Sequence, residues 1–140
     1  VYMDRAVAGK LHCPTAGARS SKSAYQPFER GLMFWRAHEQ AVYVLDAGGG
    51  WIRYPDAWDD TQPQANPDLV PPAGLLQPVR GFGKVWRERL GGPGASTGWA
   101  LAEEQSFEML YQSFVDGQMF VGPRGEVYLL YADSTWEARN

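Results

Sequence analysis

The clearest pattern of hydrophobic and polar positions is a series of short strand-like runs separated by turn residues. Residues 41–45 are rich in β-branched and aromatic side chains, which is typical of a strand. In residues 51–54, Trp51 and Arg53 alternate with Ile52 and Tyr54, so the two pairs face opposite sides of a strand. We predict strands over residues 25–28, 32–36, 41–45 and 51–54, with a polar loop over residues 15–23 before them.

This series occurs twice, in residues 25–51 (the first copy) and residues 111–136 (the second copy). Such an internal repeat predicts an architecture built from two similar units. In the first part of each copy, the matched residues are Tyr25, Gln26, Phe28, Gly31, Met33 and Phe34 with Tyr111, Gln112, Phe114, Gly117, Met119 and Phe120. The hairpin turn then differs by one residue between the copies. After the turn, the matched residues are Tyr43, Leu45 and Trp51 with Tyr128, Leu130 and Trp136.

A helical period occurs between the two copies. Phe82, Trp86 and Leu90 fall at four-residue spacing, which predicts a helix over residues 79–90 with one apolar stripe. Residues 55–78 are rich in proline, which excludes a central strand or a helix there. We predict that this connection packs on the domain through Trp58 and its aliphatic residues. Residues 1–10 could be the tail of another helix.

Together these elements predict a single domain over residues 1–140 that is mainly β. Pseudo-repeat one covers about residues 11–54, the Pro-rich connection covers residues 55–78, and the short α-helix with pseudo-repeat two covers about residues 79–136. The 140 residues include 16 glycines, 10 prolines and 14% aromatic residues, a composition that favours short strands and tight turns over a helical bundle.

Charge and hydropathy exclude several classes of protein. The net charge of −3 argues against binding to nucleic acid or to an anionic membrane surface, because both require concentrated positive charge. No run approaches the roughly 18 apolar residues of a membrane span, and no charged-then-apolar signal region opens the chain. A single cysteine, Cys13, excludes an internal disulfide and a zinc cluster built from several cysteines.

Candidate catalytic and metal-binding residues give only weak signals. Cys13 follows His12, but neighbouring residues in a strand point to opposite faces. Asp56, Asp59 and Asp60 lack the ligand spacing of a calcium loop, and adjacent carboxylates such as Glu103 and Glu104 usually face water. We therefore expect no catalytic residue, no metal and no cofactor, and keep a glycoside hydrolase that uses Glu103 or an aspartate of residues 55–60 as a second alternative.

Short motifs recur in the layout of each unit. The second unit contains Lys84-Val85-Trp86, Leu90-Gly91-Gly92, Gly98-Trp99-Ala100, Glu103-Glu104, Tyr111-Gln112-Ser113-Phe114 and Gly117, and the first unit contains Leu11-His12-Cys13-Pro14, Tyr25-Gln26-Pro27-Phe28 and Gly31. This layout resembles the LGFP repeat of bacterial cell-surface proteins, and the resemblance implies an extracellular or cell-wall-associated protein. Three features depart from the pattern: Ala100 replaces a proline, His12 replaces a glycine, and the Pro-rich connection has no counterpart.

Aromatic residues that the two copies do not share indicate where a site could lie. Trp35, Trp58 and Trp99 have no aromatic counterpart, and a flat ring can stack on the C–H face of a sugar or on an apolar partner. We predict a non-catalytic binding module for cell-wall or surface glycan. A structural subunit that contacts other protein chains of a surface assembly is the alternative. The predicted ligand-binding residues are Tyr54, Asp56, Trp58, Arg80 and Trp99.

Overall fold

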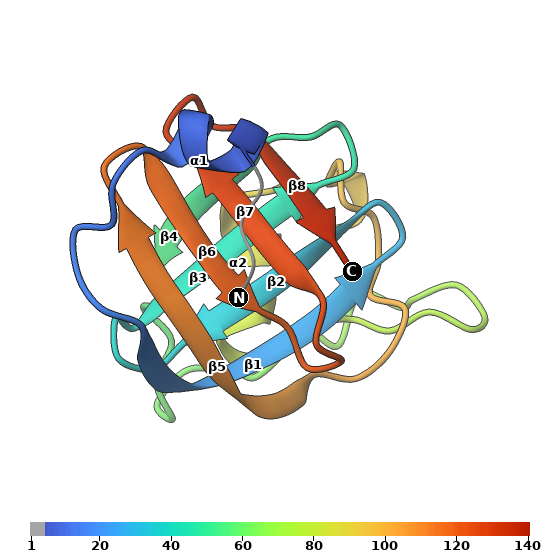
Figure 1. Cartoon of the computed structure of the whole chain (residues 1–140). Helices are drawn as coiled ribbons and strands as arrows, with labels where there is room; N and C mark the ends of the chain where they lie inside the picture. The colour runs from blue at the N-terminus through green and yellow to red at the C-terminus, as the bar shows by residue number, and fades with distance from the viewer. Residues whose placement is uncertain (1–4) are drawn as a thin grey trace.

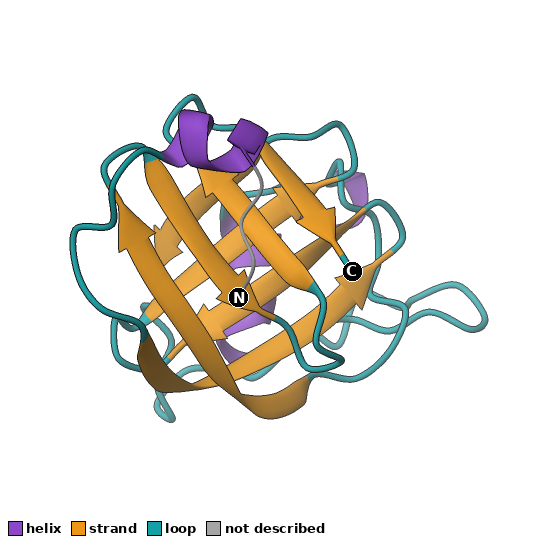
Figure 2. Ribbon diagram, in the orientation of Figure 1, coloured by secondary structure: helices purple, strands orange, loops and turns teal. Residues whose placement is uncertain are grey.

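The computed structural model describes residues 5–140, which form eight strands, two α-helices and one 3₁₀ turn (Figures 1 and 2). The elements in chain order are α1 (Arg5–Leu11), β1 (Arg19–Phe28), β2 (Gly31–Arg36), β3 (Ala41–Asp46), β4 (Trp51–Pro55), α2 (Arg80–Glu88), η1 (Gly92–Gly94), β5 (Gln105–Phe114), β6 (Gly117–Val121), β7 (Val127–Tyr131) and β8 (Trp136–Arg139).

The eight strands form one antiparallel sheet in the order β4-β3-β2-β1-β5-β6-β7-β8. The two outermost strands meet at their first residues, where Gly50 and Thr135 form a β-bridge. The N–H of Trp51 donates to the carbonyl oxygen of Ser134 at 3.0 Å, and the N–H of Trp136 donates to that of Gly49 at 2.9 Å. The sheet is therefore nearly closed on itself, and the prediction of a mainly β fold is confirmed.

The concave face of the sheet encloses an aromatic core. Phe34 on β2 lies with its ring centroid 4.8 Å from those of Phe120 and of Tyr128, although two strands separate β2 from β6 within the sheet. These contacts across the interior show how strongly the sheet curves. The buried members of this inner core are Tyr25, Phe34, Ala41, Tyr43, Leu45, Met109, Tyr111, Phe120, Tyr128 and Leu130.

One cation lies inside this aromatic core. The side chain of Arg36 is 1% exposed. Its guanidinium donates to Glu39 at 2.9 Å and to Gln118 at 2.8 Å, and it lies 4.0 Å above the ring centroid of Tyr111. A buried charge requires both an ionic partner and hydrogen bonds, and Arg36 has both.

The two α-helices cover different parts of the convex face. In Figure 1, α1 lies at one end of the sheet over β6 and β7, and α2 lies on the far side. Val7 and Leu11 of α1 pack with Met119, Leu129 and Tyr131. On the other side, α2 packs against residues of β1, β2 and β3, so each helix adds a second apolar layer outside the sheet.

The predicted helix between the two copies is confirmed, with bounds at Arg80 and Glu88. Phe82 and Trp86 are buried, and Leu90, just beyond the helix, is partly buried against the same cluster. The indole N–H of Trp86 donates to the carbonyl oxygen of Gly98 at 2.8 Å, which satisfies the polar atom of a fully buried ring.

Residues that match in sequence take matching positions in the sheet. Phe34 pairs with Tyr43 as Phe120 pairs with Tyr128. Gln26 donates to the carbonyl oxygen of Ala102, and Gln112 donates to that of Ala16. The division of the chain into two pseudo-repeats stays an interpretation of the sequence.

Two matched glycines allow a close approach between neighbouring strands. A Cβ atom at Gly31 would lie 2.5 Å from the carbonyl oxygen of Leu45. A Cβ atom at Gly117 would meet the carbonyl oxygen of Leu130 even more closely. Any larger residue would therefore separate β2 from β3, or β6 from β7.

The structure corrects one of the two predictions for the chain before the first hairpin and confirms a helix near its start. The predicted loop over residues 15–23 is wrong at its end, because β1 begins at Arg19 and pairs with β5 from Arg19–Tyr111 to Tyr25–Gln105. Ser21 and Ser23 are buried in this strand, so serines take the inward positions that apolar residues usually mark. The helix expected within residues 1–10 is present as α1, while residues 1–4 lie outside the described part of the chain.

The Pro-rich connection packs on the domain as predicted, although only some of its apolar residues take part. Leu69 and Leu75 pack against the cluster beneath α2, whereas Val70 is 78% exposed.

No helix within residues 5–140 is long and apolar enough to cross a membrane.

Candidate ligand-binding groove

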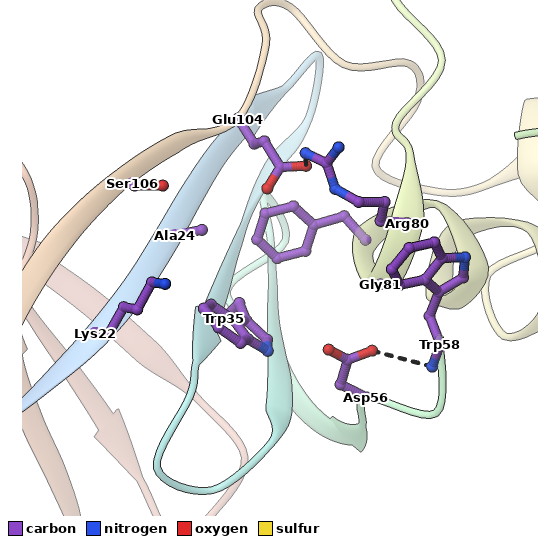
Figure 3. Close-up of a pocket in the computed structure, with 10 residues that line it drawn as sticks. Lys22, Ala24, Trp35, Asp56, Trp58, Arg80, Gly81, Glu104 and Ser106 are labelled. Carbon is purple, nitrogen blue, oxygen red and sulfur yellow. Dashed lines mark hydrogen bonds and ion pairs between the residues drawn. The ribbon is translucent and has the colours of Figure 1, made fainter. Parts of the chain in front are cut away.

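A groove of about 270 Å³ lies on the convex face of the sheet, between β1, β2 and the start of α2 (Figure 3). Its floor comes from neighbouring strands, because Ala24 on β1 pairs with Trp35 on β2. The segment after β4 and the segment before β5 supply its rims. The lining residues are Lys22, Ala24, Trp35, Asp56, Trp58, Arg80, Gly81, Phe82, Glu104 and Ser106.

An ion pair forms one rim of the groove. The Arg80 guanidinium donates to Glu104 at 2.9 Å, and the two side chains are 44% and 25% exposed. Arg80 adopts a φ of 53° at the first position of α2, a left-handed conformation that costs a non-glycine residue about 1–3 kcal/mol. Its backbone N–H donates to the carbonyl oxygen of Gln64 at 2.9 Å, so the Pro-rich connection holds Arg80 in this conformation.

Asp56 forms the opposite rim (Figure 3). Its backbone N–H donates to the carbonyl oxygen of Gln40 at 2.8 Å, and its Oδ1 accepts the backbone N–H of Trp58 at 3.2 Å. A Cβ atom at Gly81 would lie 2.6 Å from Asp56 Oδ1. A glycine at this first turn of α2 therefore lets the carboxylate approach the helix.

Trp58 is a partly exposed ring held at one edge. Its indole N–H donates to the carbonyl oxygen of Pro63 at 3.1 Å, and in Figure 3 the ring lies beside Gly81 at the mouth of the groove. Because the polar edge is already satisfied within the connection, a face of the ring is left for apolar contact.

Trp35 contributes a different kind of group. Its Nε1 is buried and has no hydrogen-bond partner among residues 5–140. Figure 3 shows this nitrogen pointing toward the Asp56 side of the groove. The mismatch of Trp35 with Val121 was a signal in the sequence, but the predicted site did not include Trp35.

The structure brings three of the five predicted ligand-binding residues together, namely Asp56, Trp58 and Arg80. The other two do not line the groove. Trp99 is 9% exposed and packs with its ring centroid 5.0 Å from that of Trp86. The expectation of a partly exposed Trp99 in the site is wrong, because Trp99 fills the apolar layer between α2 and the sheet.

Tyr54 also lies away from the groove. It is partly buried against the cluster beneath α2, and the guanidinium carbon of Arg89 lies 5.9 Å from its ring centroid. On β4, the Tyr54 ring therefore lies against core residues and Arg89. It does not line the groove, although Asp56 and Trp58, which follow it closely in the chain, do.

A second groove, of about 280 Å³, occupies the matching position in the second copy. At the spacing that matches Tyr25 with Tyr111, Leu110 takes the place of Ala24, Val121 that of Trp35, and Ala18 that of Glu104. Its walls carry no charged side chain from residues 5–140; they are Pro14, Ala18, Leu110, Tyr111, Gln112, Phe114, Met119, Phe120 and Val121. The polar rims are thus particular to the first groove.

The remaining sequence candidates lie elsewhere. His12 contacts Asp116 through its Nδ1, and Cys13 is exposed. Asp59 accepts hydrogen bonds from the side chain and the backbone of Thr61, which lower the pKa of its carboxyl, so it stabilises its own turn. Across residues 5–140 no three His, Cys, Asp or Glu side chains are grouped to hold a metal ion.

No protein-family model, curated protein sequence or solved structure matches this chain. The resemblance to the LGFP repeat therefore rests on the short sequence matches alone.

Proposed function

We propose that this protein is a non-catalytic binding module that recognises a glycan in the groove between α2 and the sheet. One observation carries the proposal: a partly exposed tryptophan ring lies in a groove whose opposite rims carry hydrogen-bonding side chains. Asp56 forms one rim and the Arg80–Glu104 ion pair forms the other. Tryptophan and a few oriented polar groups are the usual components of a small-molecule site.

The groove matches the mixed chemistry of a sugar. A pyranose ring presents an apolar C–H face, which Trp58 can contact, and hydroxyl groups that both donate and accept hydrogen bonds. The Arg80–Glu104 pair offers N–H donors beside a carboxylate acceptor, so it can bind two neighbouring hydroxyls. Asp56 adds an acceptor on the other side.

The size of the groove favours a short ligand. Its volume of about 270 Å³ is slightly below the roughly 300–1,000 Å³ of pockets that enclose drug-sized molecules. We therefore propose that it holds one sugar ring, such as a terminal or branching residue of a longer polysaccharide. An extracellular or cell-wall location, and cell-wall glycan as the partner, belong to the proposal through the sequence resemblance.

The proposal is tested by titrating cell-wall polysaccharide against the protein and three variants, with tryptophan fluorescence and calorimetry as readouts. Trp58→Ala and Asp56→Asn should each weaken binding at least about tenfold, or about 1.4 kcal/mol. Leu110→Ala, in the second groove, is the matched control and should leave binding unchanged. Equal binding by all four proteins, or no binding at millimolar sugar, would refute the proposal.

The same samples test the absence of catalysis. Incubation with nitrophenyl glycosides should release no nitrophenol, because Glu104 is held by the Arg80 guanidinium at 2.9 Å and is not free to act on a glycosidic oxygen. Steady nitrophenol release that is abolished by Glu103→Gln, or by Asp56→Asn, Asp59→Asn or Asp60→Asn, would instead support the hydrolase alternative.

A further inference from the structure

The floor of the groove combines an apolar surface with one unused donor. Ala24 is 4% exposed and Phe82 is 3% exposed, and both line the groove beside the Trp35 ring. The Trp35 Nε1 is buried with no acceptor among the described residues. A buried N–H without an acceptor destabilises the folded protein, and such groups are rare enough to require an explanation.

We propose that the groove is specific for a sugar that carries an acetamido group, such as an N-acetylhexosamine, and that Trp35 donates its indole N–H to the acetamido oxygen. This inference rests on the proposed function and names the class of sugar that the same groove binds. It also assigns a role to Trp35, which becomes a residue that determines specificity.

Each part of an acetamido group has a counterpart in this groove. The methyl group can pack on the apolar floor formed by Ala24 and Phe82. The amide N–H can donate to Asp56, whose Oδ1 accepts one backbone N–H and whose Oδ2 accepts none from residues 5–140. The carbonyl oxygen can accept from Trp35, whose Nε1 points toward the Asp56 side of the groove (Figure 3).

Binding in this way requires a small movement. Because Trp35 Nε1 is covered in the structure, a neighbouring side chain must move before the acetamido oxygen reaches it, and we propose that Asp56, toward which this nitrogen points (Figure 3), changes rotamer. Asp56 is partly exposed and lies just beyond the last residue of β4, so a rotation of its carboxylate disturbs no core packing. The hydroxyls on the far side of the sugar ring then meet the Arg80–Glu104 pair.

The composition of the groove argues against other modified sugars. A sugar acid would bring its carboxylate close to Asp56 and Glu104, and like charges in a partly desolvated site repel. A free amino sugar would place its ammonium beside Asp56, but it has no carbonyl oxygen for Trp35 and no methyl group for the apolar floor. An acetamido group is uncharged, is both a donor and an acceptor, and supplies both of these groups.

The test compares three probes by calorimetry on the wild-type protein: methyl N-acetylglucosaminide, methyl glucoside and methyl glucosaminide. The acetamido sugar should bind about tenfold more tightly than the glucoside, or about 1.4 kcal/mol. Equal binding of these two sugars would overturn the inference while leaving the proposed function in place. Tightest binding of the free amine would also overturn it. No binding of any of the three at millimolar concentration would overturn both.

Trp35→Phe removes the donor and keeps a ring. It should abolish the preference for the acetamido sugar by weakening acetamido-sugar binding about tenfold more than glucoside binding. It should lower the melting temperature less than the control substitution does, because both substitutions shorten an indole ring but the Trp35 N–H has no partner to lose. Trp51→Phe is the matched control: its indole N–H is satisfied by the carbonyl oxygen of Tyr131 at 2.9 Å, outside the groove. That variant should melt at a lower temperature and keep the preference. An unchanged preference in Trp35→Phe would overturn the role of Trp35.

Discussion

The ion pair between Arg36 and Glu39 gives an asymmetric prediction about stability. The two side chains are 1% and 26% exposed, so removing either partner leaves the other in a different environment. Glu39→Gln leaves a buried guanidinium without its counter-charge. Arg36→Met leaves a carboxylate that still contacts water and lies 3.5 Å from Arg53. We therefore expect Glu39→Gln to be the more destabilising substitution.

The expected magnitudes follow from the burial of each group. Breaking a buried ion pair from one side costs about 3–5 kcal/mol, and the partial exposure of Glu39 places Glu39→Gln near the lower end, at about 3 kcal/mol. Arg36→Met replaces a buried charge with an apolar chain of similar length, and its main cost is the hydrogen bonds lost by Glu39 and Gln118, about 1–2 kcal/mol. The double variant should be close to Arg36→Met alone, because no buried cation is left.

Urea unfolding at neutral pH, followed by tryptophan fluorescence, measures all four free energies, and urea leaves the ionic strength unchanged. A larger loss for Arg36→Met than for Glu39→Gln would refute the reasoning. It would mean that the faces of Tyr111 and Tyr43, 4.0 and 4.8 Å from the guanidinium carbon, stabilise the cation more than the carboxylate does.

The pH dependence of stability gives an independent check. Burial raises the pKa of Glu39, but the Tyr43 hydroxyl and the Arg36 guanidinium outweigh it, so the pKa lies below its ordinary value of 4.5. The ionised carboxylate therefore stabilises the fold above about pH 4.5, and this contribution is lost as the pH falls through the lowered pKa. Glu39→Gln should show a smaller loss of stability than the wild type over that acidic range.

Three further substitutions test the packing. Trp86→Ala removes a fully buried ring and should cost about 3–5 kcal/mol in urea unfolding; an unchanged free energy would show that α2 is peripheral. Gly117→Ala brings a Cβ against the carbonyl oxygen of Leu130. This clash should cost about 1–3 kcal/mol of stability, as core overpacking does, and should therefore lower the melting temperature; a wild-type melting curve would contradict the close approach. Trp136→Phe removes the hydrogen bond that the indole N–H donates to the carbonyl oxygen of Asp46 at 2.9 Å. It should lower the free energy of unfolding by about 1 kcal/mol, measured by calorimetry; a larger loss of stability than that of Trp136→Ala would contradict this account.

Much of the fold could be predicted because local patterns and tertiary packing agree. The β-branched and aromatic side chains of residues 41–45 marked β3, and the four-residue spacing of Phe82, Trp86 and Leu90 marked α2, because in each case apolar residues occupy the buried positions. The start of β1 was missed for the opposite reason: its inward positions near Arg19 are the serines Ser21 and Ser23. Only the pairing with β5, which is remote in sequence, makes this segment a strand.

The groove was predicted in part. Trp58 and Asp56 lie close in sequence, and Arg80 was named as a polar neighbour, but the contact between Arg80 and Glu104 depends on how α2 packs on the sheet. The mismatch between the two copies identified unusual aromatic residues without saying which layer each one occupies. Trp99 lies under α2, and Trp35 lines the groove. No local sequence pattern distinguishes these two environments.

The exposed connection has a practical consequence for how the molecule could be divided. Cleavage near Val70, which is 78% exposed, would leave two fragments that share the β1–β5 pairing and the inner core. Each fragment alone would present a long unpaired strand edge and half of an aromatic interior, so the two should reassociate, with a stability that depends on their concentration. The groove takes Trp35 and Asp56 from one fragment and Arg80 and Glu104 from the other. A ligand of the groove would therefore act as a chemical inducer of association, and the split chain as a reporter of that ligand.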